Sequence, residues 1–178
     1  MTGVLTRVRE AAAGYAPGQR RPLRGYLITM GAYAGLTGGL AVLARLTGRT
    51  PPDRVDTRDV VLMSIATHKV SRMLAKDSVT SPLRAPFTRY AGPSGDAELG
   101  EEVRGTGLRH SVGELVSCPF CLGVWVATGF AAGLVFAPRL TRLAAATFTA
   151  VAVSDTLQLT YAAAQQLPRR AAGDASED

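Results

Sequence analysis

Two cysteines three residues apart are the side chains of this sequence with the clearest capacity for chemistry. Cys118 and Cys121 are the only cysteines, and they enclose Pro119 in a Cys-Pro-Phe-Cys run. Proline fits the first turn of a helix, and the positive end of the helix dipole favours a thiolate. Dithiol oxidoreductases use this arrangement, but the spacing alone is unspecific, because no thioredoxin-like βαβ pattern accompanies it.

Three interpretations of the cysteine pair remain open. The first is packing at an interface without chemistry, and the second is a thiol-redox function in which Glu114 is the candidate proton shuttle. The third is a metal site, because His68 and His110 are the only histidines and would complete a Cys2His2 set. Nothing in the spacing brings the histidines to the thiols, so we predict neither a bound metal nor a cofactor.

An acidic residue in an otherwise apolar stretch is a second candidate for chemistry. Asp155 interrupts the apolar run that begins at Leu143. A carboxylate surrounded by lipid is costly, so we expect it to pair with Lys69 or Arg72 and to hold two helices together. The alternative is a small transporter or channel component built around Asp155 and Arg72.

The segments that carry these residues have the hydropathy of membrane helices. Residues 25–44 and 115–138 are uncharged runs, each long enough to cross a hydrocarbon core of about 30 Å. The expected fold class is therefore an all-α integral membrane helical bundle of about four transmembrane helices. The second helix has one charged face, so it could also lie at the interface. The predicted helices cover residues 25–46, 58–76, 115–138 and 142–167, and a hydrophilic loop covers residues 77–111.

Small residues at helical spacing predict close packing between these helices. Gly31, Gly35 and Gly39 recur every four residues, and Gly129 and Gly133 repeat the spacing. The chain is therefore expected to pack against a second copy of itself or against another membrane protein. In the third segment, Ser111 and Glu114 match a capping box and predict the start of a helix there.

The charged residues predict the orientation of the chain and its other partners. The formal net charge is +6, but no aromatic residues are interleaved with the basic ones, so we expect no nucleic acid partner. Lys and Arg are twice as numerous on the side that holds both termini, which places both termini in the cytoplasm. Residues 1–24 form a basic tail or an interfacial helix, and residues 168–178 a disordered tail. The bilayer, including its anionic lipids, is the expected partner.

The longest motif resembles a known family. Residues 113–125 read Gly-Glu-Leu-Val-Ser-Cys-Pro-Phe-Cys-Leu-Gly-Val-Trp, and residues 66–72 and 81–87 carry further matching runs. Together they resemble domain of unknown function 1360, a family found in sporulating bacilli and actinobacteria. The resemblance implies a small multi-pass membrane protein of bacteria, with no established activity and no assigned catalytic residues. It makes Arg84 and Trp125 part of the pattern, and Trp125 also fits an anchor at the lipid interface.

The expected function is that of a non-enzymatic scaffold or accessory subunit in a bacterial cell membrane. The sequence has no Ser-His-Asp set, no phosphate-binding loop and no adequate set of metal ligands. We therefore favour a protein that is not an enzyme over the thiol-redox and transport alternatives.

Overall fold

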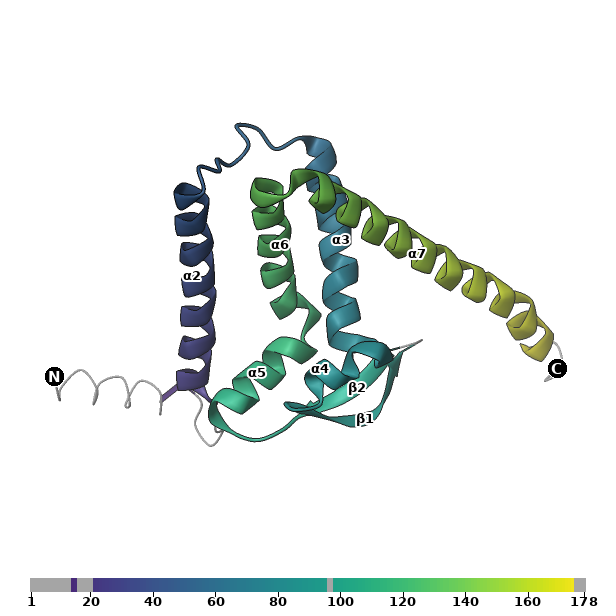
Figure 1. The fold of residues 1–178 in the computed structure, drawn as a ribbon. Helices are drawn as coiled ribbons and strands as arrows, with labels where there is room; N and C mark the ends of the chain where they lie inside the picture. Colours follow the sequence, from purple (N-terminus) through teal and green to yellow (C-terminus); the bar gives the residue numbers. More distant parts are fainter. Residues whose placement is uncertain (1–13, 16–20, 96–97, 175–178) are drawn as a thin grey trace. The chain divides into compact units, whose positions relative to one another are not determined.

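The structure, a computed structural model, describes residues 14–15, 21–95 and 98–174. Most of the predicted tail or interfacial helix over residues 1–24 lies outside the described residues, as do residues 175–178 of the predicted C-terminal tail. The elements follow one another along the chain as labelled in Figure 1. They are α2 (Leu23–Leu46), α3 (Thr57–Lys76), η1 (Ser78–Thr80), α4 (Ser81–Arg84), β1 (Thr88–Gly95), β2 (Glu98–Val103), α5 (Gly107–Ser117), α6 (Pro119–Phe136) and α7 (Pro138–Asp174).

The chain divides into two compact units. The first unit combines the chain through Val42 with Leu74–Leu122, and the second combines Leu43–Met73 with the chain from Gly123 onward. The helices α2, α3 and α6 each contribute residues to both units.

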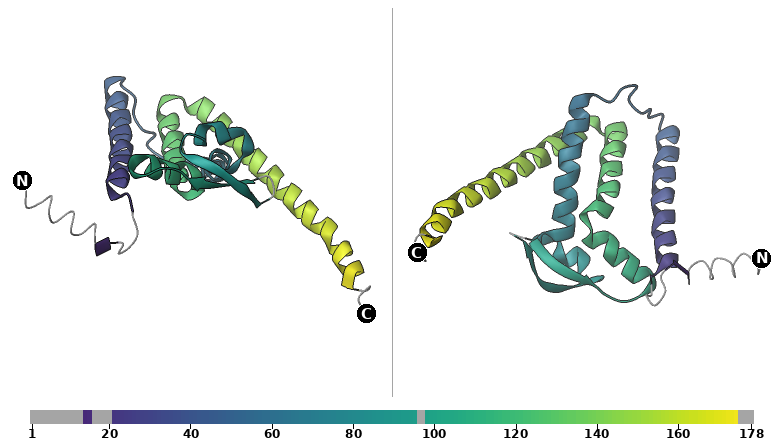
Figure 2. Two further views of the ribbon diagram at one scale, coloured as in Figure 1. Left: turned by 90° about the horizontal axis from the view of Figure 1, so that it is seen from below. Right: turned by 180° about the vertical axis from the view of Figure 1, so that it is seen from behind.

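The first unit contains a small antiparallel sheet. Strands β1 and β2 pair with Thr88 opposite Val103 and Arg89 opposite Glu102. The ladder is irregular between Tyr90 and Gly92, where Gly92 takes a φ of 122° that favours glycine. The hairpin lies beside α4 and α5 in the views of Figures 1 and 2.

Glycine lets α5 approach this hairpin closely. Gly113 is buried, and a Cβ atom built there would lie 2.9 Å from the carbonyl oxygen of Phe87 and closer still to the side chain of Val103. No side chain fits without displacing the strand. The second unit has a comparable contact, where Gly133 at the end of α6 faces Thr141 in the first turns of α7.

The predicted all-α bundle of about four transmembrane helices is wrong. Among the described helices only α2 and α6 are long and apolar enough to cross a membrane. The predicted hydrophilic loop over 77–111 contains the two-stranded sheet and the start of α5. The predicted second helix exists as α3, but residues such as Asp59, Lys69 and Arg72 make it too polar.

The start of the predicted third helix also differs from the structure. Helix α5 begins at Gly107, so Ser111 is an interior residue whose hydroxyl donates to the carbonyl of Gly107, and not the cap of a helix. The helical run then breaks at Cys118, which is extended with φ −105° and ψ 108°. Proline causes the break, because the ring of Pro119 disfavours helical geometry in the residue before it.

We predict that Gly113→Ala destabilises the first unit by about 1–3 kcal/mol, because the added methyl group must displace the hairpin. The measurement is the free energy of unfolding of the purified chain. Gly95→Ala is the control, because a Cβ at that strand position meets no atom within 4 Å. Equal stabilities of the two variants would contradict the close packing of α5 on the hairpin.

Candidate functional site

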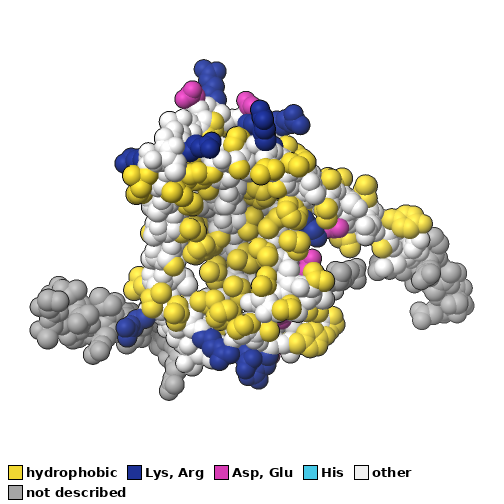
Figure 3. All heavy atoms as spheres, in the orientation of Figure 1, with side chains coloured by type: hydrophobic (Ala, Val, Ile, Leu, Met, Phe, Trp, Pro, Cys, Tyr) yellow, Lys and Arg dark blue, Asp and Glu magenta, His cyan; other side chains and the backbone are white. Residues whose placement is uncertain are grey.

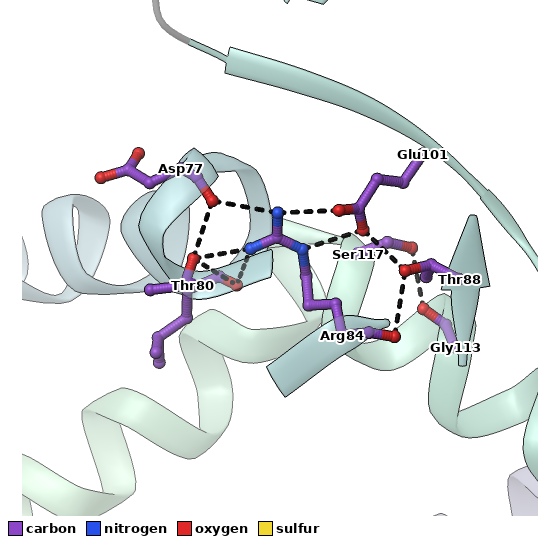
Figure 4. A network of polar contacts seen from close by, with 8 residues as sticks. Asp77, Thr80, Arg84, Thr88, Glu101, Gly113 and Ser117 are labelled. Carbon is purple, nitrogen blue, oxygen red and sulfur yellow. Dashed lines mark hydrogen bonds and ion pairs between the residues drawn. The ribbon is translucent and has the colours of Figure 1, made fainter. Parts of the chain in front are cut away.

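A fully buried arginine is the centre of the first unit. Arg84, the last residue of α4, is only 1% exposed (Figure 4). Its guanidinium donates two hydrogen bonds to the carboxylate of Glu101 in β2, with both N···O distances at 2.9 Å, and so forms a bidentate ion pair. A planar guanidinium matches a carboxylate in this geometry, which a lysine ammonium does not reproduce.

The remaining N–H groups of Arg84 bind the segment that precedes α4. One terminal nitrogen donates to the carbonyl of Leu74 at 2.8 Å and to the hydroxyl of Thr80 at 2.6 Å. The other donates to the carbonyl of Asp77 at 3.1 Å. All five donors of the side chain therefore have acceptors. Through them, Arg84 holds together η1, strand β2 and the C-terminal end of α3.

Thr88 completes the network on the carboxylate side. Its hydroxyl donates to Glu101 at 2.8 Å and lies 3.0 Å from the carbonyl oxygen of Arg84. Burial alone would raise the pKa of Glu101, but the hydrogen bonds from Arg84 and Thr88 outweigh it and hold that pKa below its usual range. Among the described residues, no buried side-chain nitrogen or oxygen lacks a partner.

A second polar cluster ties the start of α2 to α5. Glu114 accepts a 2.5 Å hydrogen bond from the hydroxyl of Tyr26 and forms ion-pair contacts with Arg21 at 3.3 Å and His110 at 3.4 Å. The backbones are close here, because a Cβ at Gly25 would overlap the side chain of Ser111. Glu114, the predicted proton shuttle, is thus occupied by three partners.

The cysteine pair lies at the junction of α5 and α6. The Sγ atoms of Cys118 and Cys121 are 2.7 Å apart, and the backbone N–H of Cys121 donates to the Sγ of Cys118 at 3.3 Å. Both residues are free thiols, and Cys121 is exposed. In the part of the chain that the structure describes, no three His, Cys, Asp or Glu residues are grouped to hold a metal ion, and His110 contacts Glu114.

In the second unit, two ion pairs connect α3 to α7. Lys69 lies 2.7 Å from Asp155, so the structure brings together these two residues, which were predicted to form a charge pair. Arg142 contacts both carboxylate oxygens of Asp59, at 2.7 and 3.0 Å. Its hydrogen bond lowers the pKa of the Asp59 carboxyl, in spite of the opposing effect of burial.

The other predicted residues lie on α2, α3 and α6. Arg72 of α3 and Trp125 of α6 are half-buried, and His68 of α3 is exposed. A Cβ placed at the predicted packing glycines of α2, or at Gly129 of α6, meets no atom within 4 Å, whereas Gly133 is closely packed. The packing glycines of α2 are Gly31, Gly35 and Gly39.

Sequence reasoning missed the partners that complete the networks. Glu101, Thr88 and Tyr26 were not singled out, nor was the pair of Asp59 with Arg142. In the sequence, Glu101 lies in a short acidic run that follows Gly92-Pro93. Such a pattern is typical of an exposed loop and does not indicate a buried ion pair.

Comparisons with known proteins place the chain among proteins without an assigned activity. The model of a family described as "Protein of unknown function (DUF1360)" matches residues 62–161. The sporulation protein YjcA of Bacillus subtilis (strain 168) is 38% identical over 71 residues, which are 38% of this chain and 60% of that protein. The chain thus matches less than two thirds of the length of this relative. No solved structure matches the chain.

We predict that Arg84→Met destabilises the chain by roughly 3–5 kcal/mol, because it leaves the Glu101 carboxylate buried without its partner. Arg84→Lys keeps the charge but loses the two-pronged geometry, so its effect should be intermediate. The free energy of unfolding is the measurement, and Arg89→Met on the exposed surface of β1 is the control, expected within about 0.5 kcal/mol of the parent. Equal effects at the two arginines would rule out the network as the support of this unit.

The lowered pKa of Glu101 predicts a dependence of stability on pH. Its ionised form is favoured in the folded state, so its contribution is complete above the unfolded carboxyl pKa of about 4.3 and is lost as pH falls through the lower folded value. We therefore expect the stability difference between the parent chain and Glu101→Gln to shrink below about pH 4.3. A difference that stays constant from pH 7 to pH 3 would contradict the ion pair.

Proposed function

The chain belongs to the DUF1360 family of proteins of unknown function, and we propose that it is a membrane-inserted, non-enzymatic accessory protein. In this proposal α2 and α6 lie in the lipid bilayer of a bacterial cell. Residues 74–117, here called the polar module, lie at the membrane surface and present a rigid structure to a partner.

The exposure of the two apolar helices carries the proposal. Almost all of their residues are exposed or half-buried: the one buried residue is Gly25 in α2 and Leu134 in α6. Large side chains such as Met30 of α2 and Phe120 of α6 are 65% and 89% exposed, and hydrophobic side chains gather on the face shown in Figure 3. Water-soluble proteins seldom leave such a surface uncovered, whereas a bilayer solvates it.

The polar networks favour a structural role over catalysis. The donors of Arg84 are all used within the polar module, and Glu114 is held by its neighbours, so neither is free to act on a substrate. The two best-formed hollows have volumes of about 420 and 440 Å³, and no Cys, His, Asp or Glu lines either of them. Acid–base or nucleophilic chemistry requires such groups at a cavity.

Basic residues support one orientation of the polar module. Lys76, Arg89, Arg104 and Arg109 belong to this module, and Arg21 lies beside it through the contact with Glu114. Positively charged segments next to membrane helices remain on the cytoplasmic side and attract anionic lipid headgroups. We place the polar module at a membrane surface that carries anionic lipid headgroups.

The open glycine face of α2 is consistent with an accessory role. Gly31, Gly35 and Gly39 leave space above the helix backbone. In lipid, such a face permits the backbone of another helix to approach closely. The occupant we propose is a helix of another membrane protein that needs the polar module beside it.

Insertion of α2 predicts the behaviour of a single substitution. Leu36→Arg places a charge near the middle of α2, where lipid insertion costs roughly 2.5–3.5 kcal/mol. We expect a smaller fraction of this variant than of the parent to stay in membranes after alkaline carbonate extraction. Val79→Arg, at an 83% exposed site in η1, is the matched control and should behave as the parent.

Release of the parent chain itself by carbonate would overturn the proposal. Equal retention of Leu36→Arg and Val79→Arg would also count against insertion of α2.

A further inference from the structure

The cysteine pair has a geometry that the accessory role does not use. The 2.7 Å between the Sγ atoms of Cys118 and Cys121 is only about 0.7 Å longer than a covalent S–S bond. The bend between α5 and α6 produces this approach, because extended Cys118 precedes the first turn of α6 and Cys121 lies in that turn.

The local backbone distinguishes the two thiols. Cys118 occupies the position that caps α6, and its sulfur accepts both the backbone N–H and the S–H of Cys121. Reactive cysteines are commonly found at helix N-termini. We therefore assign Cys118 as the attacking nucleophile of the pair. Cys121 is the resolving thiol, which reacts second.

Exposure argues against the two simpler roles of the pair. Structural cysteines are among the most buried residues, whereas Cys121, at the end of α6 that adjoins the polar module, is exposed and Cys118 is half-buried. A structural zinc site needs four ligands, and the described residues offer no group of three. The remaining chemistry for two adjacent, accessible thiols is thiol–disulfide exchange.

We propose that Cys118 and Cys121 form a reversible dithiol–disulfide site that exchanges with an external disulfide. The Cys118 thiolate attacks one sulfur of the external disulfide, forms a mixed disulfide and releases the first thiolate. Cys121 then loses its proton to that thiolate and attacks the Sγ of Cys118, which releases the second external thiolate. This second thiolate takes from solvent the proton that Cys118 gave up when it ionised. The protein dithiol is oxidised by two electrons, and one external disulfide is reduced to two thiols.

The first experiment titrates the purified full-length chain in detergent with mixtures of reduced and oxidised glutathione. Remaining thiols are blocked with N-ethylmaleimide and counted by intact mass. We expect two populations. One carries two labels, and the other carries none and is lighter than the unlabelled reduced chain by two hydrogens. The fraction of the second population should rise with the proportion of oxidised glutathione through a single midpoint. The readout does not require membrane insertion, so its failure leaves the accessory role untouched.

A matched variant tests the spacing. Cys121→Ser combined with Phe120→Cys moves the second thiol to a position two residues from Cys118, and residues two apart on a helix do not face each other. The intramolecular disulfide should then require at least about a tenfold more oxidising glutathione mixture, because the reach of a disulfide is short. An unchanged midpoint would overturn the geometric assignment.

Cys121→Ser identifies the source of the external disulfide in the cell, because it leaves the mixed disulfide on Cys118 unresolved. A mass gain equal to a small thiol identifies a low-molecular-weight disulfide, and a protein-sized adduct that reductant removes identifies a protein disulfide. The proposal is overturned if both thiols of the parent chain are labelled at every glutathione ratio, or if oxidation only links separate chains.

Discussion

The burial of the Arg84 guanidinium is the constraint on which the first unit depends. A charge that is 1% exposed is tolerated only when a partner and hydrogen bonds replace the lost water. Glu101 supplies the charge, and the carbonyls of Leu74 and Asp77 supply acceptors from the end of α3 and the link to η1. Because every donor has one acceptor, a shift of the hairpin relative to α4 would leave part of the network unsatisfied. The hairpin, too small to be stable alone, is thereby held in one position.

The same constraint links the module to the apolar helices. Once β1 and β2 are fixed, Gly113 lets α5 pack closely on the hairpin. The next residue, Glu114, contacts Tyr26 at the start of α2. The chain then turns at Cys118 into α6. A rigid polar structure is thus joined to the N-terminal ends of two helices that water does not solvate well. This combination explains how a short chain with few buried apolar residues can hold a defined polar surface.

Features set by residues close together in the chain, such as apolar helices and the cysteine motif, could be predicted from the sequence. Features set by contacts between distant residues, such as the hairpin and its ion pair, could not. The apolar runs at 25–44 and 115–138 contain the two helices that could cross a membrane, and the motif around Cys118 indicated the family, which the comparison confirms. The four-helix bundle was wrong because length and periodicity did not weigh the polar residues of α3 and of α7, which contains the predicted helix over 142–167. The hairpin was missed because Gly92 and Pro93 indicate a turn, while the pairing of Arg84 with Glu101 spans 17 residues and has no local signature.

The most direct test of the central claim is the depth of α2 in a bilayer. A spin label is placed at residue 36 in one sample and at residue 79 in another, on a chain with Cys118→Ser and Cys121→Ser, and reconstituted in vesicles. Collision rates with oxygen, which concentrates in lipid, are compared with those of a water-soluble nickel chelate. The account predicts that oxygen dominates at residue 36 and nickel at residue 79. Dominance of nickel at both positions would show that α2 lies in water and would contradict membrane insertion.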